Sequence, residues 1–375
     1  MKKNFKSVLQ TVLVGAFVLI LSVTCWLKPA TASSATERRP LAQFPSVTFD
    51  SIFNSAEGNS FMTQFETYTL DQFPLRDPLR TLKALTAFYV YQLNDNNDYY
   101  VSDGVISKMD HIIHPESIEY ATGRLQMLYE QKLQDKASNI YLAVIPDKNS
   151  FTAPESGHLS LDNEAFIQEI RNKMPYASYI DIAQLLSAED YYATDTHWRQ
   201  ESIVDVADTL ADAMGVTLPD EYTENTLENP FYGVYYGQAA MPVAPDTLKW
   251  LTNDTIDGLT AFNHGTQSPN AIYDLTKANG KDPYEIFMSG GKTAPITITN
   301  PNATSEKELI VFRDSFGSSI APLLAQGYKT VTLIDLRETM QAAIDLVTDV
   351  EGKDVLFLYS TLVLNNNIDG GEKFK

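Results

Sequence analysis

Short runs of consecutive apolar residues recur along the chain, and several are followed by a segment with helical spacing. The runs lie at residues 140–145, 309–312, 330–334 and 355–359. Strands without polar positions are typical of sheets covered on both faces, as parallel sheets are. The residues between them fit helices from about 317 to 325 and from about 338 to 348, and strands that alternate with helices indicate βαβ units. The pattern predicts an α/β fold in which a parallel sheet lies between two layers of helices.

Helical spacing also appears earlier in the chain, whereas one long stretch lacks it. Helices are expected over residues 79–93 and 115–136, and another runs from behind residue 198 to Met214, where Gly215 ends it. Residues 216–305 are rich in Tyr, Asn, Pro and Thr and show no long helical period. We expect this stretch to be an inserted, partly antiparallel region that caps the functional site.

The N-terminus has the pattern of a membrane segment. Lys2, Lys3 and Lys6 precede an uncharged run of 21 residues, 7–27, which is long enough to cross a hydrocarbon core of about 30 Å as a helix. We expect an uncleaved anchor, although Ala30-Thr31-Ala32 also fits the cleavage site of a signal peptide. Lysines at this end favour a cytoplasmic N-terminus, so the body of the protein is expected outside the cytoplasm.

The remaining chain divides into two parts. Residues 29–60 contain Pro29, Pro40 and Gly58 and are expected to form a stalk with little packed structure. The predicted organisation is therefore an anchor or signal sequence at 1–28, this stalk, and one α/β domain at 61–375.

Composition excludes several classes of function. The 375 residues include 28 Lys and Arg against 48 Asp and Glu, a net charge of −20. Such a chain repels phosphate backbones, so nucleic-acid binding is not expected. Cys25 is the only cysteine, which excludes a disulfide within the chain and a thiolate metal cluster. No metal or other cofactor is expected.

The strand at 309–312 ends in a candidate nucleophile. Arg313-Asp314-Ser315-Phe316-Gly317 follows it and leads into the next predicted helix. Active sites of open α/β sheets gather at the carboxyl ends of strands. At such a turn, Ser315 lies beside backbone N–H groups that can bind an oxyanion, as acyl transfer requires. The alternative is that Asp314 or Ser315 only caps the helix.

A second candidate element lies in the loop before the helix that ends at Met214. Asp195 and His197 are two residues apart there, close enough for the carboxylate to orient the imidazole. An imidazole held in this way can take the proton of a serine. Two alternatives remain: a pair of metal ligands that lacks an obvious third member, and a histidine with a purely structural role.

Taken together, these elements resemble a known family. The stretches are Ile145-Pro146-Asp147-Lys148, Asp195-Thr196-His197-Trp198 and Arg313-Asp314-Ser315-Phe316-Gly317. They resemble the DHHW proteins, which are related to the SGNH-hydrolase-like domains of bacterial alginate O-acetylation proteins. Residues 37–42, 71–77 and 335–337 fit the same pattern, so the resemblance extends over about 37–375.

The resemblance implies an SGNH-hydrolase-like fold with a permuted motif order and a triad with defined roles. Ser315 would be the nucleophile, His197 the general base, and Asp195 the group that fixes the imidazole. Two positions depart from the related patterns. Thr196 replaces the first histidine of Asp-His-His-Trp, which leaves the triad intact. Arg313 stands where the hydrolases have glycine, which is expected to crowd or charge the oxyanion side.

Four further residues are candidates for binding. Asn365 is a candidate for the oxyanion hole, although Asn365-Asn366-Asn367 equally fits a turn. Lys148 and Arg337 follow strand ends and are candidates for holding an anionic sugar, or else for salt bridges. Trp198 is a candidate for stacking on a carbohydrate, or else a core residue.

The favoured function is transfer of an acyl group, in the first instance acetyl, to or from a hydroxyl of a cell-envelope or exopolysaccharide glycan. The resemblance implies a partner, a membrane-bound O-acyltransferase that supplies the acyl group. A non-catalytic, surface-anchored glycan-binding or scaffold protein on the same fold is the alternative. A metal-dependent deacetylase is a third and weaker interpretation.

Overall fold

The computed structural model describes residues 2–53, 60–368 and 372–375, and the chain separates into two compact units. The N-terminal unit consists of residues 1–93 and 240–242, and the sheet unit of residues 94–239 and 243–375. Each unit is described by itself.

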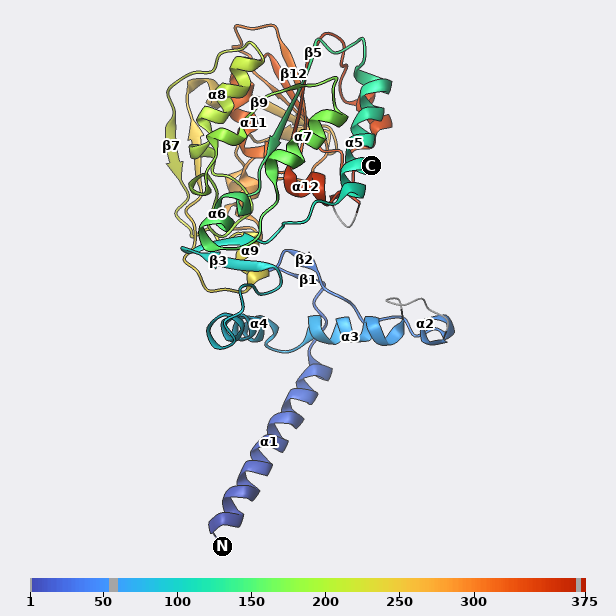
Figure 1. Cartoon of the computed structure of the whole chain (residues 1–375), viewed down its shortest axis with the longest axis vertical. Helices are drawn as coiled ribbons and strands as arrows, with labels where there is room; N and C mark the ends of the chain where they lie inside the picture. Colours follow the sequence, from blue (N-terminus) through green and yellow to red (C-terminus); the bar gives the residue numbers. More distant parts are fainter. Residues whose placement is uncertain (1, 54–59, 369–371) are drawn as a thin grey trace. The chain divides into compact units, whose positions relative to one another are not determined.

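An eight-stranded sheet forms the centre of the sheet unit, in the order β10-β9-β11-β13-β12-β14-β5-β6 (Figure 1). The strands from β13 to β6 are parallel, and β11, β9 and β10 continue the sheet antiparallel. The three antiparallel strands come from the predicted insertion at 216–305. The predicted α/β fold with a partly antiparallel insertion is therefore confirmed. The strands are β5 (Asn139–Ile145), β6 (Ser178–Tyr179), β9 (Thr260–Asn263), β10 (Ser268–Asn270), β11 (Ile296–Thr299), β12 (Glu308–Arg313), β13 (Thr330–Ile334) and β14 (Asp354–Ser360).

Helices cover both faces of the sheet because its central strands are apolar on both sides. Along β12, Leu309 and Val311 belong to one core cluster, and Ile310 and Phe312 belong to the other. The first cluster includes side chains of α8 (Val204–Ala213) and α11 (Gly317–Leu324), and the second those of α5 (Pro115–Leu128), α7 (Asn163–Lys173) and α12 (Thr361–Asn365). Figure 1 shows these two layers of helices.

Smaller elements surround this sandwich. Two antiparallel hairpins pair β3 (Tyr99–Ser102) with β4 (Val105–Lys108) and β7 (Thr223–Thr226) with β8 (Lys249–Thr252). Short helices are α6 (Asn149–Ser156), α9 (Val234–Ala239) and α10 (Asp254–Asp257), and a π-helical turn, Tyr129–Leu133, extends α5. The 3₁₀ turns are Ala183–Leu185, Ala188–Asp190, Gln200–Ser202, Leu275–Asn279, Pro283–Ile286, Ala325–Gly327 and Gln341–Leu346.

The prediction of a helix at 338–348 is wrong. Only the 3₁₀ turn Gln341–Leu346 forms there. Asp335 explains the difference, because its carbonyl accepts from the N–H groups of Glu338 and Thr339 and its carboxylate accepts from the N–H of Arg337. The residues after β13 are thus folded around Asp335 instead of continuing as a regular helix.

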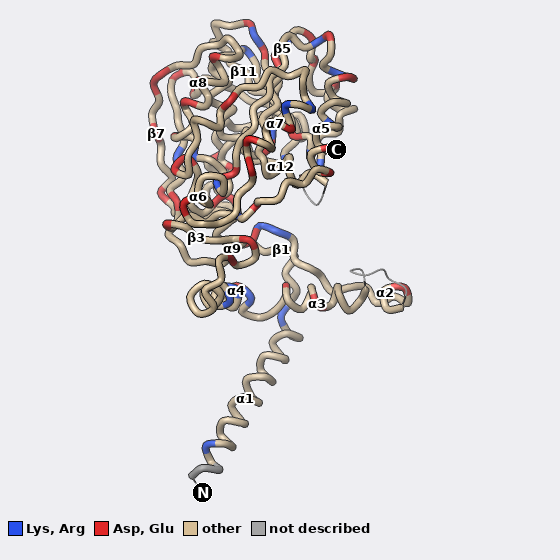
Figure 2. The backbone as a smooth tube through the Cα atoms, viewed as in Figure 1, with Lys and Arg blue, Asp and Glu red and all other residues tan. Residues whose placement is uncertain are grey.

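The N-terminal unit begins with α1 (Lys2–Leu27), in which Phe5–Leu27 is long and apolar enough to cross a membrane. Figure 2 shows α1 without charged residues between Lys6 and Lys28. The segment expected as a stalk contains β1 (Ser33–Ser34), β2 (Arg39–Pro40) and α2 (Phe49–Phe53), and its residues 54–59 lie outside the described residues. The unit ends with α3 (Phe61–Gln72), α4 (Arg76–Leu85) and the π-helical turn Thr86–Val90, so the helix expected at 79–93 begins and ends earlier.

Candidate active site

Ser315 lies in a tight turn between β12 and α11 that a buried carboxylate fixes. The Asp314 carboxylate accepts hydrogen bonds from the Phe316 N–H at 3.0 Å and from the N–H and hydroxyl of Ser360, both at 2.7 Å. Burial raises the pKa of Asp314, and these donors oppose the increase. Because Ser360 ends the neighbouring strand β14, Asp314 ties the turn of Ser315 to the carboxyl end of that strand.

Asp195 and His197 lie in the loop between β6 and α8, and Asp195 organises that loop. One oxygen of its carboxylate accepts from the backbone N–H of His197 at 3.1 Å and lies 2.5 Å from Nδ1 of the His197 ring. The other oxygen accepts from the N–H of Val234 at 2.7 Å. With Nδ1 bound to the carboxylate, Nε2 of the imidazole is available as a base.

The predicted triad residues meet. Nε2 of His197 lies 2.7 Å from Oγ of Ser315, although the two residues are 118 positions apart in the chain. Asp195 is fully buried, His197 is 7% exposed, and Ser315 is half-buried at the surface of the site. Serine, imidazole and carboxylate therefore form one continuous hydrogen-bonded line with its nucleophilic end accessible.

Tyr284 holds the imidazole from one side, and no sequence motif indicated this contact. The Tyr284 ring stacks on the His197 ring with centroids 3.9 Å apart and planes inclined by 7°. Its hydroxyl donates to Oγ of Ser319 at 2.9 Å, and the indole N–H of Trp198 donates to the same oxygen at 2.9 Å. The tyrosine comes from the insertion, whose position over the site only the fold determines.

The insertion also supports the loop that carries Asp195. Asp246 accepts hydrogen bonds from the backbone N–H groups of Ala193 and Thr194, both at 2.7 Å. A Cβ on Gly233 would lie 2.3 Å from Cβ of Asp195, so only glycine fits there. Gly233 and Asp246, both from the insertion, thus support the loop that carries Asp195.

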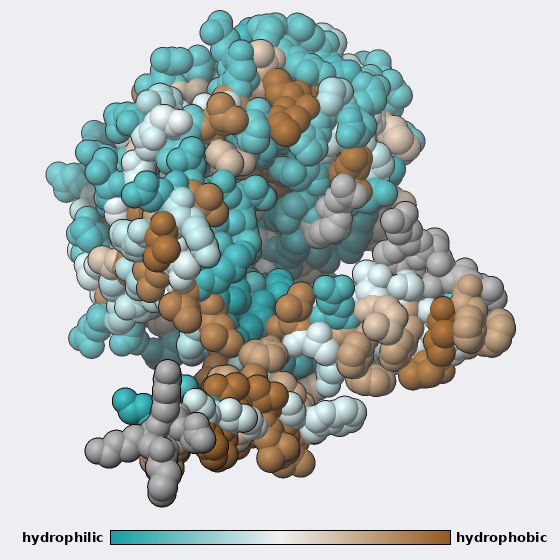
Figure 3. Space-filling view, turned by 60° about the horizontal axis from the view of Figure 1, so that its bottom comes forward, coloured by the Kyte–Doolittle hydropathy of each residue, from teal (hydrophilic) through white to brown (hydrophobic). Residues whose placement is uncertain are grey.

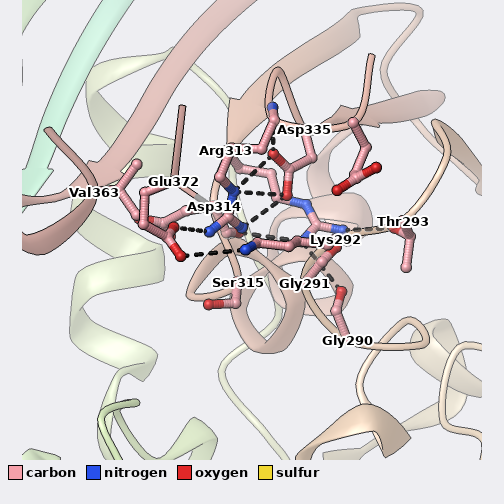
Figure 4. A network of polar contacts seen from close by, with 12 residues as sticks. Gly290, Gly291, Lys292, Thr293, Arg313, Asp314, Ser315, Asp335, Val363 and Glu372 are labelled. Atoms are coloured by element: carbon pink, nitrogen blue, oxygen red, sulfur yellow. Dashed lines mark hydrogen bonds and ion pairs between the residues drawn. The ribbon is translucent and has the colours of Figure 1, made fainter. Parts of the chain in front are cut away.

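Arg313 organises a backbone segment beside the nucleophile (Figure 4). Its buried guanidinium donates to the carbonyls of Gly290 and Gly291, both at 3.1 Å. A Cβ on Gly291 would lie 2.8 Å from Cβ of Ser315, so this backbone is as close to the serine as a chain can come. Arg313 therefore fills the place of the hydrolase glycine by holding a loop. For the described part of the chain, no hydrogen-bond partner is found for the N–H of Ser315 or of Gly291.

The triad and its supporting turn coincide with a family match. Residues 173–334 match the DHHW protein family. This stretch includes Asp195, His197 and Ser315, and it confirms the resemblance deduced from the motifs.

Solved structures agree on the fold. A DHHW family protein from Eubacterium siraeum is similar over 74% of this chain and 95% of its own, with 21% identity and a TM-score of 0.61. Bacillus cereus PatB1 is similar over 75% of this chain and 100% of its own, with 22% identity and a TM-score of 0.54. The PatB1 structure with a sulfonyl adduct has a TM-score of 0.52 at 22% identity, over 74% of this chain and 99% of that one. No curated protein sequence matches the chain. At these identities the likeness shows that this chain shares the fold of these proteins.

Lys148 supports the loop that carries Asp195 from within the protein. The side chain is fully buried, and its ammonium donates to the carbonyls of Tyr192 at 2.7 Å, Ala193 at 3.3 Å and Asp195 at 2.6 Å. Burial lowers the pKa of this ammonium to about 8. All three donors are used, so none is left for an anionic sugar.

Arg337 is likewise engaged within the protein. Its guanidinium donates to both carboxylate oxygens of Asp335, with the shortest contact at 2.8 Å, and it pairs with Glu372. Lys292 pairs with the same Glu372 at 3.3 Å (Figure 4). Burial alone would raise the pKa of Asp335, but the guanidinium lowers it below its ordinary value. This network joins the segment that follows β13 to Lys292, the residue after Gly291.

The other two binding candidates also have structural contacts. Trp198 is fully buried and packs edge-to-face against Phe316. It therefore presents no ring face to a sugar. Asn365 ends α12, and its amide is bound to a neighbouring loop: it accepts from the N–H of His114 at 2.8 Å and donates to the carbonyl of Ile112 at 2.8 Å. In residues 2–53, 60–368 and 372–375, no group of three or more His, Cys, Asp or Glu side chains is placed to hold a metal.

Proposed function

We propose that this protein transfers an acyl group, in the first instance acetyl, to or from a hydroxyl of an envelope or exopolysaccharide glycan, with Ser315 as nucleophile. The observation that carries the proposal is the line from Asp195 through His197 to Ser315, with contacts of 2.5 and 2.7 Å. A serine in this arrangement loses its proton to the imidazole as it attacks a carbonyl.

In the first half-reaction, Oγ of Ser315 attacks the acyl carbonyl carbon of the donor, and its proton passes to Nε2 of His197. Asp195 stabilises the imidazolium that forms. The tetrahedral intermediate then collapses, the donor oxygen leaves with the proton from His197, and the acyl group remains as an ester on Ser315.

The negative oxygen of the intermediate needs donors, and two backbone groups are suited to this role. The N–H groups of Ser315 and Gly291 belong to segments in close contact, and neither has a partner in the described residues. We assign them as the oxyanion hole, with Arg313 fixing the peptide that carries the Gly291 N–H through its hydrogen bond to the Gly290 carbonyl.

In the second half-reaction, a hydroxyl attacks the carbonyl carbon of the ester on Ser315, and His197 takes its proton as base. The ester bond then breaks, and His197 returns the proton to Oγ of Ser315. A sugar hydroxyl gives a transferase and water gives an esterase. We place the sheet unit outside the cytoplasm, with α1 as the membrane anchor, and expect a membrane-bound O-acyltransferase to supply the acyl group.

Labelling of the serine tests the chemistry. A sulfonyl fluoride reagent should modify the full chain at Ser315, in line with the sulfonyl adduct described for PatB1. The adduct, located by peptide mass spectrometry, should be absent from Ser315→Ala and nearly absent from His197→Ala. Equal labelling of the His197→Ala variant would contradict the mechanism.

An acetyl-transfer assay tests the reaction. The protein is supplied with 4-nitrophenyl acetate, with and without an acceptor glycan. Acetyl recovered on the glycan supports a transferase, and release of acetate alone supports an esterase. No labelling at Ser315 together with no turnover would leave a non-catalytic glycan-binding or scaffold protein as the better interpretation.

A further inference from the structure

The N-terminal unit contains a helix whose charged face is turned inward. On α4, Arg76 lies 2.5 Å from Glu37 and 3.4 Å from Asp71, and Arg80 lies 3.1 Å from Glu37. The two acidic side chains are almost fully buried, at 8% and 7% exposure. The arginines of α4 are therefore used to hold the helix to the rest of its unit.

A second face of α4, flanked by the exposed Asp77 and Lys83, is apolar and exposed. Leu75, Leu79 and Leu82 follow the i, i+4, i+7 spacing of one helical stripe and are 70%, 43% and 59% exposed. The apolar surface continues into Tyr89 and Val90, at 75% and 69% exposure. A helix of a water-soluble domain has the reverse arrangement, with its apolar stripe inward.

Aromatic side chains extend this apolar surface over the neighbouring segments. Phe44, Phe49 and Phe53 are 56%, 71% and 69% exposed. Phe44 makes edge-to-face contacts with Phe61, Phe65 and Tyr68 of α3, so the exposed ring belongs to an ordered cluster. Figure 3 shows the hydrophobic side chains gathered over α1 to α4. An exposed apolar surface of this kind marks an interaction site.

Hydrogen bonds tie this surface to the end of α1. Lys28 Nζ donates to the carbonyl of Gln72, the last residue of α3, at 3.3 Å. The Gln72 amide also exchanges hydrogen bonds with the backbone of Thr31, at 2.8 and 2.9 Å. Trp26, at 87% exposure, ends the apolar helix in the way that aromatic residues mark a membrane–water boundary. The carboxyl end of α3 is thus fixed at the level where α1 would leave the bilayer.

We propose that α3, α4 and the turn Thr86–Val90 lie on the bilayer surface, with the stripe Leu75-Leu79-Leu82 and the exposed aromatic rings inserted at the headgroup boundary. The inference rests on the proposed role of α1 as a membrane anchor. Lipid is the occupant that the observations favour, because the surface is continuous with α1 in one unit. With a net charge of −20 the chain is repelled by anionic lipid, so apolar contact and not basic charge holds the unit there.

Depth-dependent quenching in vesicles tests the proposal on the full chain. Cys25 is the only cysteine, so a Cys25→Ser background allows one fluorescent label at a time. The label is placed at Leu82→Cys on α4, at Leu19→Cys within α1, or at Leu346→Cys, an exposed leucine of the sheet unit that serves as control. Each variant is reconstituted in phosphatidylcholine vesicles with or without spin-labelled lipid.

We expect labels at Leu82 and Leu19 to lose most of their emission to spin-labelled lipid, and the label at Leu346 to keep it. Quenching at Leu19 but not at Leu82 would overturn the surface contact and leave the anchor standing. No quenching at Leu19 would overturn the anchor, and equal quenching at Leu82 and Leu346 would show that contact with lipid is not specific to α4. Labelling of Ser315 in the same samples reports the chemistry independently, and Leu79→Cys repeats the α4 measurement on the same stripe.

Discussion

The two units of this chain arrange polar and apolar groups in opposite ways. In the sheet unit, apolar side chains fill both sides of the sheet, and the charges that are buried, such as Asp335 and Arg337, surround the nucleophile turn. In the N-terminal unit, Glu37 and Asp71 are buried against arginines, whereas leucines and aromatic rings are exposed. The same kinds of residue therefore indicate different surroundings: water around the sheet unit, and lipid beside the N-terminal unit.

Buried charges have different tasks in the two units. A buried ion pair is costly to desolvate and is retained where it fixes a geometry. Near Ser315, Arg337 pairs with Asp335 and Glu372, and Lys292, which follows Gly291, pairs with the same Glu372. Around Glu37, such pairs leave an entire helix face free to be apolar. Substitutions of buried charges in the two units should therefore affect different measured properties.

The largest expected effect separates chemistry from anchoring. Ser315→Ala or His197→Ala should lower turnover by about three orders of magnitude or more, because the triad acts as one unit. Glu37→Gln, in the charged cluster of the N-terminal unit, should leave turnover of a soluble acetyl ester within about twofold. Steady-state kinetics on the full chain measure both.

A matched histidine provides the control for this prediction. His264 also lies in the sheet unit, where its Nε2 is 2.9 Å from the Thr297 hydroxyl. His264→Ala should retain near-normal turnover. Equal losses in His197→Ala and His264→Ala would mean that the histidines act through folding and not through the reaction.

The second prediction compares the charged clusters by stability. Asp335→Ala leaves the buried guanidinium of Arg337 without its main partner and should cost about 3–5 kcal/mol of unfolding free energy. Asp71→Ala should cost about 1 kcal/mol, because its partner Arg39 is 40% exposed and partly solvated. Hydrogen exchange followed by peptide mass spectrometry reports each unit separately. A larger loss for Asp71→Ala would reverse the comparison.

The third prediction concerns the tyrosine that stacks on the imidazole. Tyr284→Ala removes the ring that fixes His197 and should lower kcat by about tenfold to a hundredfold with little change in KM. Tyr284→Phe retains the ring and should restore most of kcat, although it loses the hydrogen bond to Ser319. If the phenylalanine variant is as impaired as the alanine variant, the hydroxyl and not the stacking is what matters.

The smallest expected effect is a difference in pH dependence. Burial raises the pKa of Asp147 in the sheet unit to about 6, from the ordinary value of 3.8. The folded state then holds this proton more tightly than the unfolded state, so stability falls as pH rises from about 4 to 6. Asp147→Asn should remove this contribution, as measured by denaturant unfolding at several pH values.

Asp71 should contribute with the opposite sign. The hydrogen bond from Arg39 lowers the pKa of Asp71, so its stabilisation is present above the ordinary pKa and is lost as pH falls through the lowered value. Protection factors for hydrogen exchange in the N-terminal unit, corrected for the intrinsic exchange rate at each pH, should therefore fall on acidification, less so in Asp71→Asn. The same pH trend in the unmodified protein and in Asp71→Asn would contradict this role of Asp71.

Local pattern was sufficient to predict much of the sheet. The runs at 309–312 and 355–359 became β12 and β14 because continuous apolar strands can only be buried on both faces. The position of Ser315 in a strand-to-helix turn could be predicted because a strand ends just before it and a helix begins just after it. The prediction of a helix at 338–348 was wrong because Asp335 binds Arg337, two residues later, and redirects the chain. The spacing of apolar residues does not reveal such an interaction.

The sequence by itself determined the α/β class and the apolar N-terminal helix, since each depends on neighbours in the chain. Only the tertiary structure decided that His197 and Ser315 meet, that Tyr284 stacks on the imidazole, and that Lys148 and Arg337 are used internally. It also decided which face of α4 is exposed, because the arginines turn inward only where Glu37 and Asp71 are present to receive them. These features depend on contacts between distant segments, and such contacts form only when the whole chain has folded.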